Sequence, residues 1–197
     1  MSHEEKTNEL NKICEEIASC KKCNLCKQRT QTVPGEGNSD ADLVFIGEAP
    51  GAKEDESGVP FCGSAGKFLS TMLDLIGLRR EDIFITNTVK CRPPQNRDPE
   101  EIEKNICRKY LERQLEIIDP KIIICMGRHS MATYLPDLGT ISELHGKPLR
   151  RKDGRVYLPL YHPAAALYNG SLRNVLIEDF KRIPDIIKKI NSDNINK

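Results

Sequence analysis

The chain has 197 residues, of which 38% are hydrophobic and 30% charged, so we expect a globular, soluble protein with enough length for one packed core. No stretch approaches the roughly 18 consecutive apolar residues of a membrane helix, and the polar N-terminus lacks the apolar region of a secretory signal, which together favour a cytoplasmic protein. The formal net charge of +1 is uninformative about nucleic acid, because a nucleic-acid enzyme needs only a local basic face.

Short apolar runs alternate with helical patterns along the chain. In chain order we expect a helix at 8–19, a strand at 42–47, a helix at 64–78, a strand at 82–87, a helix at 98–118, a strand at 121–126, a helix after Gly127, a strand at 156–160 and a helix at 172–190. The strands are continuously apolar rather than alternating, which is typical of a parallel sheet covered on both faces. We therefore expect one α/β domain over residues 1–197, with its N-terminal helix within 1–19.

Three helix boundaries carry specific signals. Asp98 can cap a helix, Pro99 suits its first position, and Glu101 lies three residues after the cap. Pro184 predicts a kink or break in the last helix. The polar tail 191–197 is expected to fray.

Ligands of parallel sheets bind outside the carboxyl ends of the strands. The loops that follow three of the predicted strands are the ones rich in glycine, proline and polar residues, at 47–63, 87–97 and 161–170. We expect the functional site to be built from these loops.

The eight cysteines suggest a metal centre, since clustered cysteines in a reducing cytosol more often bind metal or do redox chemistry than form disulfides. Cys20 and Cys23 have the CxxC spacing of metal ligands, Cys26 forms a second CxxC with Cys23, and Cys91 and Cys107 lie further along the chain. Spacing alone does not decide which four thiolates meet, nor whether they hold zinc or an iron–sulfur cluster. The other three cysteines are expected to be small buried apolar residues, and they are Cys14, Cys62 and Cys125.

Three loop segments resemble the signature motifs of one enzyme family. The first reads GEAPG at 47–51, ED at 54–55 and GVPFCGSAG at 58–66, the second NTVKCRPPQNR at 87–97, and the third YHPA at 161–164. In order and spacing they are similar to family-4 uracil-DNA glycosylases, and the resemblance extends from residue 20 to about residue 182. It implies a three-layer α/β/α sandwich around a four-stranded parallel sheet.

The resemblance also implies a cofactor and a substrate. The family carries a [4Fe–4S] cluster, and its ligand positions match Cys20, Cys23, Cys91 and Cys107. The expected partner is DNA containing uracil, single- or double-stranded, bound by a monomer that hydrolyses the bond between uracil and deoxyribose.

Three side chains are expected to handle the base. Asn87 offers one donor and one acceptor side by side, which match N3–H and O4 of uracil but not the reversed pair of cytosine. Phe61, placed in a glycine-rich loop, is expected to stack on the uracil face. By resemblance, His162 stabilises the negative charge that develops on uracil as the bond breaks.

The first motif supplies the remaining candidates, which are Gly47, Glu48, Ala49 and Glu54. Well-known uracil glycosylases place a water-positioning aspartate where this chain has Ala49, so Glu48 is expected to orient the water or stabilise the sugar cation. Glu54 is a further candidate, and it can instead crowd the space that a thymine methyl would need. Gly47, which opens the motif, belongs to the expected substrate-binding set.

Three other functions are compatible with parts of this sequence. A relative that traps its product covalently carries a nucleophilic histidine near the second motif, and this chain has no histidine between residues 87 and 97. A phosphate-binding enzyme is disfavoured because neither GxxxxGK[ST] nor GxGxxG is present. A non-catalytic metal-cluster module that binds nucleic acid stays open, because Ala49 replaces the aspartate.

Overall fold

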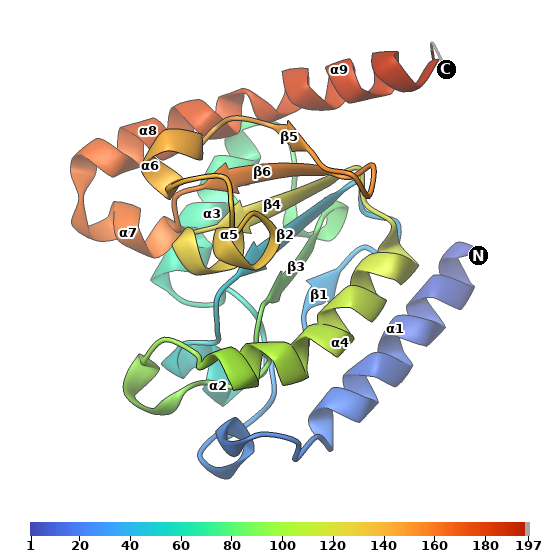
Figure 1. The fold of residues 1–197 in the computed structure, drawn as a ribbon, viewed down its shortest axis with the longest axis vertical. Coiled ribbons are helices and arrows are strands. Elements are labelled where there is room, and N and C mark those ends of the chain that lie inside the picture. The colour runs from blue at the N-terminus through green and yellow to red at the C-terminus, as the bar shows by residue number, and fades with distance from the viewer. Residues whose placement is uncertain (196–197) are drawn as a thin grey trace.

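The computed structural model describes the backbone of residues 1–195 and the side chains of residues 1–192, and it is built around one six-stranded sheet (Figure 1). The strands lie in the order β1-β3-β2-β4-β6-β5. They are β1 (Glu36–Gly37), β2 (Leu43–Gly47), β3 (Phe84–Asn87), β4 (Ile122–Met126), β5 (Leu149–Arg150) and β6 (Val156–Leu160). The four central strands are parallel and fully buried, which explains their continuous apolar sequences.

The prediction of a four-stranded parallel sheet is wrong at both edges, where the structure adds a short antiparallel strand. β1 pairs with β3 and β5 pairs with β6, so the complete sheet is mixed. Each edge strand has two residues, one of them exposed, and therefore leaves no apolar run in the sequence. The β5–β6 hairpin turns at Gly154, whose φ of 83° favours glycine.

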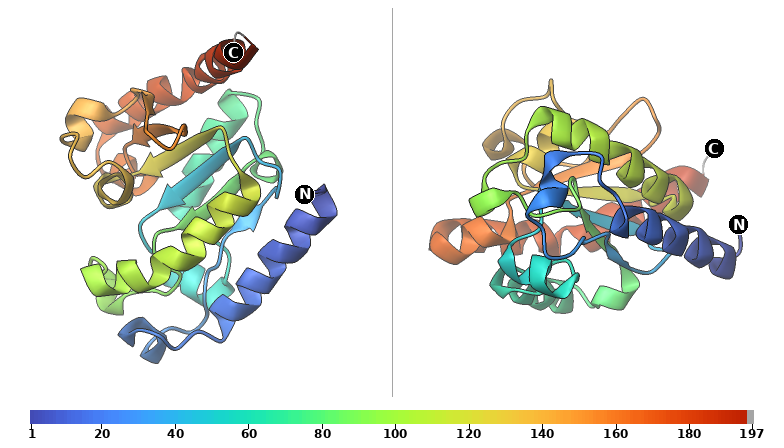
Figure 2. Two further views of the ribbon diagram at one scale, coloured as in Figure 1. Left: turned by 45° about the vertical axis from the view of Figure 1, so that its right-hand side comes forward. Right: turned by 90° about the horizontal axis from the view of Figure 1, so that it is seen from below.

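Helices cover both faces of the sheet and make a layered α/β/α arrangement (Figure 2). On one face lie α3 (Ser64–Leu75), α7 (Pro163–Tyr168), α8 (Gly170–Lys181) and α9 (Ile183–Ile195). On the other lie α1 (His3–Ala18), α4 (Glu101–Ile118), α5 (Arg128–Tyr134) and α6 (Ile141–Leu144). Side chains of one strand alternate between the two layers: Phe45 packs with the first group, whereas Val44 and Ile46 pack with the second.

The predicted start of the helix at 98–118, with Asp98 as its cap, is wrong by two residues. α4 begins at Glu101 and its cap is Glu100, whose backbone N–H donates to Glu103 at 2.8 Å. Glu103 also pairs with both guanidinium nitrogens of Arg97 at 2.8 and 2.9 Å, which holds the loop extended before the helix. Asp98 instead faces His129 at 3.1 Å.

The other helix ends agree with the sequence to within a few residues. α1 begins at His3 rather than residue 8, because Ser2 and Glu5 form a capping box. The break predicted at Pro184 is confirmed, since α8 ends at Lys181 and α9 begins at Ile183. α9 includes residues 191–195, which belong to the predicted frayed tail, and residues 196–197 of that tail lie outside the described residues.

Within residues 1–195 no helix combines the length and the apolar composition that crossing a membrane requires.

Candidate functional site

The carboxyl ends of β2, β3 and β6 open onto a cavity of about 320 Å³. Five of the predicted site residues line it, and they are Ala49, Glu54, Phe61, Asn87 and His162. They come from the three loops that the sequence singled out, and the sheet brings these loops to one edge. The helix that follows β2 in this region is α2 (Ala52–Ser57).

Gly47 is the point of the backbone at which two of these side chains meet. It is paired with Asn87 across β2 and β3. A Cβ atom at Gly47 would lie 2.3 Å from Oδ1 of Asn87 and 2.9 Å from two ring carbons of Phe61. The missing side chain therefore allows the amide and the ring to approach the same point of the backbone.

Phe61 adopts a backbone conformation that bulky residues rarely occupy, with φ of 51°. Arg80 holds this segment by donating to the carbonyl oxygens of Phe61 at 3.2 Å and Pro60 at 2.7 Å. Gly66 in α3 leaves room for the same turn, since a Cβ there would lie 1.5 Å from the Phe61 carbonyl oxygen. The surrounding structure thus fixes the aromatic ring against the cavity wall.

His162 presents one defined ring nitrogen to the cavity. The backbone N–H of Ala164 donates to Nδ1 at 3.1 Å, so the hydrogen of the neutral ring is on Nε2. Burial lowers the pKa of His162 to about 4, which keeps the ring neutral at physiological pH. The ring centroid lies 5.5 Å from that of Phe61, and Gly127 (φ 88°) leaves space for its close approach.

Glu48 lies outside the lining of this cavity. Its carboxylate is 3.8 Å from Nε2 of His129, which in turn is 3.1 Å from the carboxylate of Asp98. Burial, followed by the negative charge of Asp98, raises the pKa of Glu48 to about 7. The structure therefore separates Glu48 from the base-facing residues and surrounds it with partners that the sequence did not indicate.

Two neighbouring acidic residues of α2, Glu54 and Asp55, have different surroundings. Glu54 lines the cavity and accepts a hydrogen bond from the backbone N–H of Gly51 at 3.1 Å. Asp55 is buried and accepts the backbone N–H of Thr30 at 3.0 and 3.1 Å. Asp55 thus ties the segment after the cysteine-rich loop to α2 and faces away from solvent.

All four predicted cluster ligands line a second, small cavity beside the loop that joins β3 to α4. They are Cys20, Cys23, Cys91 and Cys107, and Cys26 lies on the same wall. The 3-10 turn Asn24–Lys27 brings the N-terminal thiols to this point, and α4 carries Cys107. Two N–H groups donate to sulfur there: Arg29 to Cys91 at 3.0 Å and the backbone of Lys90 to Cys107 at 3.3 Å.

The thiols of this cavity are more widely spaced than a single zinc ion requires. A tetrahedral zinc site with Zn–S bonds of about 2.3 Å places its sulfurs roughly 3.8 Å apart. Among the described residues, no three cysteine sulfurs lie within 4.8 Å of one another. In an iron–sulfur cube each thiolate binds a different iron, so the ligands are more widely spaced, and N–H···S donors around them are common. The residues therefore fit a cluster better than a single zinc ion.

Of the three cysteines expected to be buried apolar residues, Cys125 is buried among the core side chains. Cys14 and Cys62 are only half-buried, so that prediction is wrong for them: Cys14 lies in α1, and Cys62 lies in the loop between α2 and α3.

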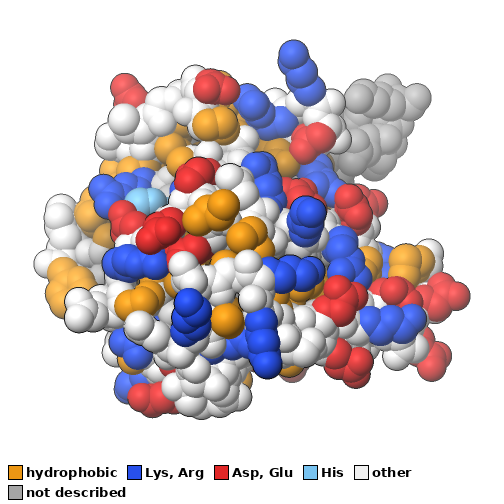
Figure 3. Space-filling model, turned by 60° about the horizontal axis from the view of Figure 1, so that its bottom comes forward, with side chains coloured by type: hydrophobic (Ala, Val, Ile, Leu, Met, Phe, Trp, Pro, Cys, Tyr) orange, Lys and Arg blue, Asp and Glu red, His pale blue; other side chains and the backbone are white. Residues whose placement is uncertain are grey.

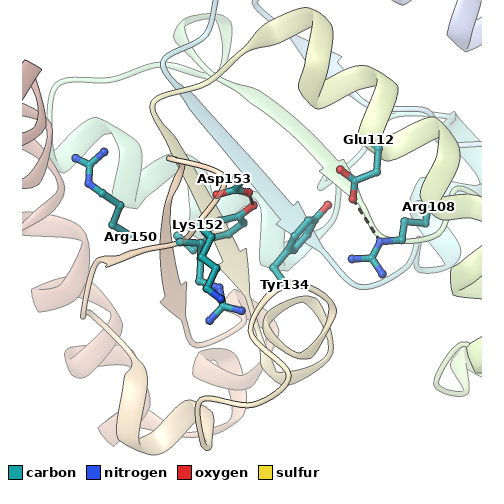
Figure 4. A pocket seen from close by; sticks show the side chains of 8 residues that line it. Arg108, Glu112, Tyr134, Arg150, Lys152 and Asp153 are labelled. Atoms are coloured by element: carbon teal, nitrogen blue, oxygen red, sulfur yellow. Dashed lines mark hydrogen bonds and ion pairs between the residues drawn. The ribbon is translucent and has the colours of Figure 1, made fainter.

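A groove of about 480 Å³ lies elsewhere, between α4 and the β5–β6 hairpin (Figure 4). Within it Arg108 contacts Glu112 at 3.3 Å, and the Tyr157 hydroxyl donates to Asp153 at 2.7 Å. It sits at the amino end of β6, and the predicted site residues do not line it. The smaller cavity at the carboxyl edge is therefore the better candidate.

The segment that follows His162 contributes exposed side chains to the rim of that cavity. Leu167 and Tyr168 line its rim, and Tyr168 is 92% exposed. Arg173 instead packs its guanidinium over the Phe68 ring, 4.4 Å from the centroid.

On the face that carries the cysteine-rich loop and the start of α4, basic and acidic side chains are interspersed rather than segregated (Figure 3).

Comparison with known proteins gives a consistent result. Residues 34–182 match the model of the uracil DNA glycosylase superfamily. The chain is 51% identical to a type-4 uracil-DNA glycosylase of Sulfurisphaera tokodaii, over 90% of this chain and 84% of that protein. It is 50% identical to one of Saccharolobus solfataricus over 94% and 90%, and 48% identical to one of Archaeoglobus fulgidus over 91% and 94%.

Proposed function

This chain belongs to the uracil DNA glycosylase superfamily, and from that membership we propose that it hydrolyses the N-glycosidic bond of deoxyuridine in DNA. Water adds to C1′ of the sugar, and uracil leaves with the bonding electron pair and later takes up a proton, so the products are free uracil and an abasic site. The observation that supports this most directly is the meeting of Asn87, Phe61 and His162 in one cavity at the carboxyl edge of the sheet. The nucleotide must enter unstacked, flipped out of a duplex or presented by a single strand.

Base recognition is assigned to Asn87 and Phe61. The Asn87 amide pairs with N3–H and O4 of uracil, and the reversed pattern of cytosine leaves both its groups unpaired. Phe61 supplies a face for stacking, which contributes about 1–3 kcal/mol per base. Glu54, tied to the Gly51 N–H, is proposed to fill the space that a thymine methyl would need.

Stabilisation of the leaving group is assigned to His162. Since Nδ1 already accepts a backbone N–H, Nε2–H is the ring's free donor, and it is proposed to bind O2 of uracil as negative charge develops. A neutral donor serves this purpose without placing a full charge in the cavity before the bond breaks.

Glu48 is proposed to act on the sugar side, where it orients the attacking water or faces the oxocarbenium-like sugar. Its backbone leads directly into Ala49, which lines the cavity, while its carboxylate is directed toward His129 and Asp98. A carboxylate near the sugar cation and a donor near the uracil anion give matching charges at both ends of the bond.

The pH dependence of the reaction tests this role. We expect kcat/KM to rise with pH through about 7, because Glu48 must lose its proton to act and its pKa is raised to about 7 by burial and then by Asp98. His162 stays neutral above about 4, so it adds no step in this range. Asp98→Asn should move the midpoint to lower pH. If the midpoint of the pH profile is unchanged in Asp98→Asn, or if Glu48→Gln retains activity, Glu48 has no part in the mechanism.

Replacing Gly47 tests the close packing of Asn87 and Phe61 at this position. Gly47→Ala is expected to lower kcat/KM about 10²-fold, because the new Cβ displaces Asn87 and Phe61 by roughly an ångström. Gly170→Ala is the matched control, because Gly170 does not line the cavity and a Cβ there would have no heavy atom within 4 Å. Steady-state kinetics on a uracil-containing oligonucleotide measure both variants. Equal kcat/KM values would contradict the view that position 47 must lack a side chain.

The cysteine-lined cavity is proposed to hold a [4Fe–4S] cluster through Cys20, Cys23, Cys91 and Cys107. Such a cluster would supply a structural crosslink, joining the N-terminal loop to the loop between β3 and α4. That loop carries Arg92 and Arg97, which the crosslink would keep ordered near the DNA backbone.

Replacement of Asn87 is the experiment that tests the proposed function. Asn87→Ala should lower uracil excision about 10- to 100-fold, the effect of two lost hydrogen bonds, while iron content and thermal unfolding stay at the wild-type level. Excision of uracil by the wild type with no dependence on Asn87 would contradict the recognition scheme. Retention of uracil-containing DNA without excision by the wild type would favour the rival assignment, a non-catalytic module that binds nucleic acid.

A further inference from the structure

Lys90 is a lysine in an unusual place, with 1% of its surface exposed. It lies three residues after Asn87 and one residue before Cys91, so it stands between the base cavity and the cysteine-lined cavity. Fully buried lysines are rare unless their charge is paired, and this one therefore calls for an explanation.

The Lys90 ammonium uses all three of its hydrogens within the protein. It donates to Oγ1 of Thr86, to the backbone carbonyl of Asn87 at 3.0 Å and to Oε1 of Gln114 at 2.8 Å. The acceptors are neutral, and among residues 1–192 no carboxylate forms an ion pair with it. The ammonium thus holds the end of β3 by direct contact with the residue that is proposed to read the base.

These contacts belong to a closed network. The Thr86 hydroxyl and the Gln114 amide both donate to the carbonyl of Pro34, each at 2.9 Å. Thr86 and Gln114 are fully buried. Because every member is satisfied by the others, displacement of one would leave several buried groups unpaired, so the network keeps the Asn87 backbone in one position.

The same residue also contacts the second cavity. Its backbone N–H donates to the sulfur of Cys107, and its side chain lines the cavity wall. Thiolates in that cavity would face the ammonium and offset its charge in the absence of a carboxylate.

We propose that Lys90 is a positioning residue for base recognition: its ammonium fixes the Asn87 carbonyl, and through it the amide that pairs with uracil, against the wall of the cysteine-lined cavity. This inference rests on the proposed role of Asn87 in uracil recognition. It assigns no contact between Lys90 and the substrate.

A double-mutant cycle tests the proposal, because Asn87→Ala removes the amide but keeps the carbonyl that Lys90 binds. Lys90→Met, which retains the length of the chain without its donors, should lower kcat/KM for uracil about tenfold in the wild-type background. In the Asn87→Ala background the same change should cost less than about twofold. Lys121→Met, at a surface pair with Asp42, is the control and should change neither background.

Each outcome decides the matter. If Lys90→Met lowers kcat/KM by the same factor in both backgrounds, or has no effect in the wild-type background, the inference is overturned. Excision by the wild type, and hence the proposed function, would be unaffected by that result. A wild type without activity would instead overturn the proposed function. If Lys90→Met loses iron or fails to fold, Gln114→Met replaces it in the cycle. This variant leaves Lys90 in place but removes one of its three acceptors. Its effect on kcat/KM should again be larger in the wild-type background than in the Asn87→Ala background, although smaller than that of Lys90→Met.

Discussion

Replacing His162 by alanine is expected to lower kcat for uracil excision by about 10²–10³, the typical effect of removing one donor aimed at a developing anion. The free Nε2–H of the neutral ring is the group that is lost. Because uracil in the ground state carries little charge at O2, binding of the uncleaved substrate should weaken much less than the rate, and KM should change by a small factor.

Two measurements accompany this variant. Single-turnover kinetics separate the chemical step from product release, and thermal unfolding checks that the cavity is intact. His3→Ala, which removes an exposed imidazole, is the control and should react at the wild-type rate. A loss confined to KM, with kcat unchanged, would show that His162 binds the base uniformly and does not stabilise the leaving anion.

Replacing Cys107 by serine is expected to abolish the cluster. Cys107 lies in α4 and faces the N-terminal cysteines across the small cavity, so its loss removes the link between two distant segments. Iron content and the visible absorbance should fall to the background level, and the melting temperature should drop on the order of 10 °C, since several kcal/mol of crosslinking are lost from a chain of this size.

The matched control is Cys62→Ser, which changes a half-buried thiol outside the cavity. It should retain full iron and the wild-type melting temperature. Full iron in Cys107→Ser would contradict the ligand set, whereas zinc in place of iron in the wild type, purified without oxygen, would contradict the cluster itself.

Much of the central fold could be predicted because burial on both faces leaves a strong mark on sequence. Phe45 and Ile124 belong to short, continuous apolar runs rich in β-branched and aromatic residues, which favours buried strands, and these runs lie within a residue or two of β2 and β4. The edge strands left no such mark. Glu36 and Gly37 pair with β3 through their backbone alone, which no side-chain pattern reveals.

The convergence of the candidate residues in one cavity was predictable, because it depends only on which loops carry them. Phe61, Asn87 and His162 follow strands that share one edge, so the parallel topology brings them together. Partners set by tertiary packing were missed. His129 reaches Glu48 and Asp98 from the start of α5, and Lys90 turns inward to Asn87, although a lysine is ordinarily taken for a surface residue. A basic residue inside a signature motif, next to a proposed ligand, was the available signal.

The central claim is that the cavity removes uracil from DNA, and one assay tests it most directly. An end-labelled oligonucleotide with a single uracil, alongside thymine and cytosine controls, is incubated with the iron-loaded protein and then heated in alkali, which breaks the chain at abasic sites. Breakage at uracil alone, with none before the alkali step, is the predicted result. Intact strands, with the protein folded and its iron in place, would contradict the account.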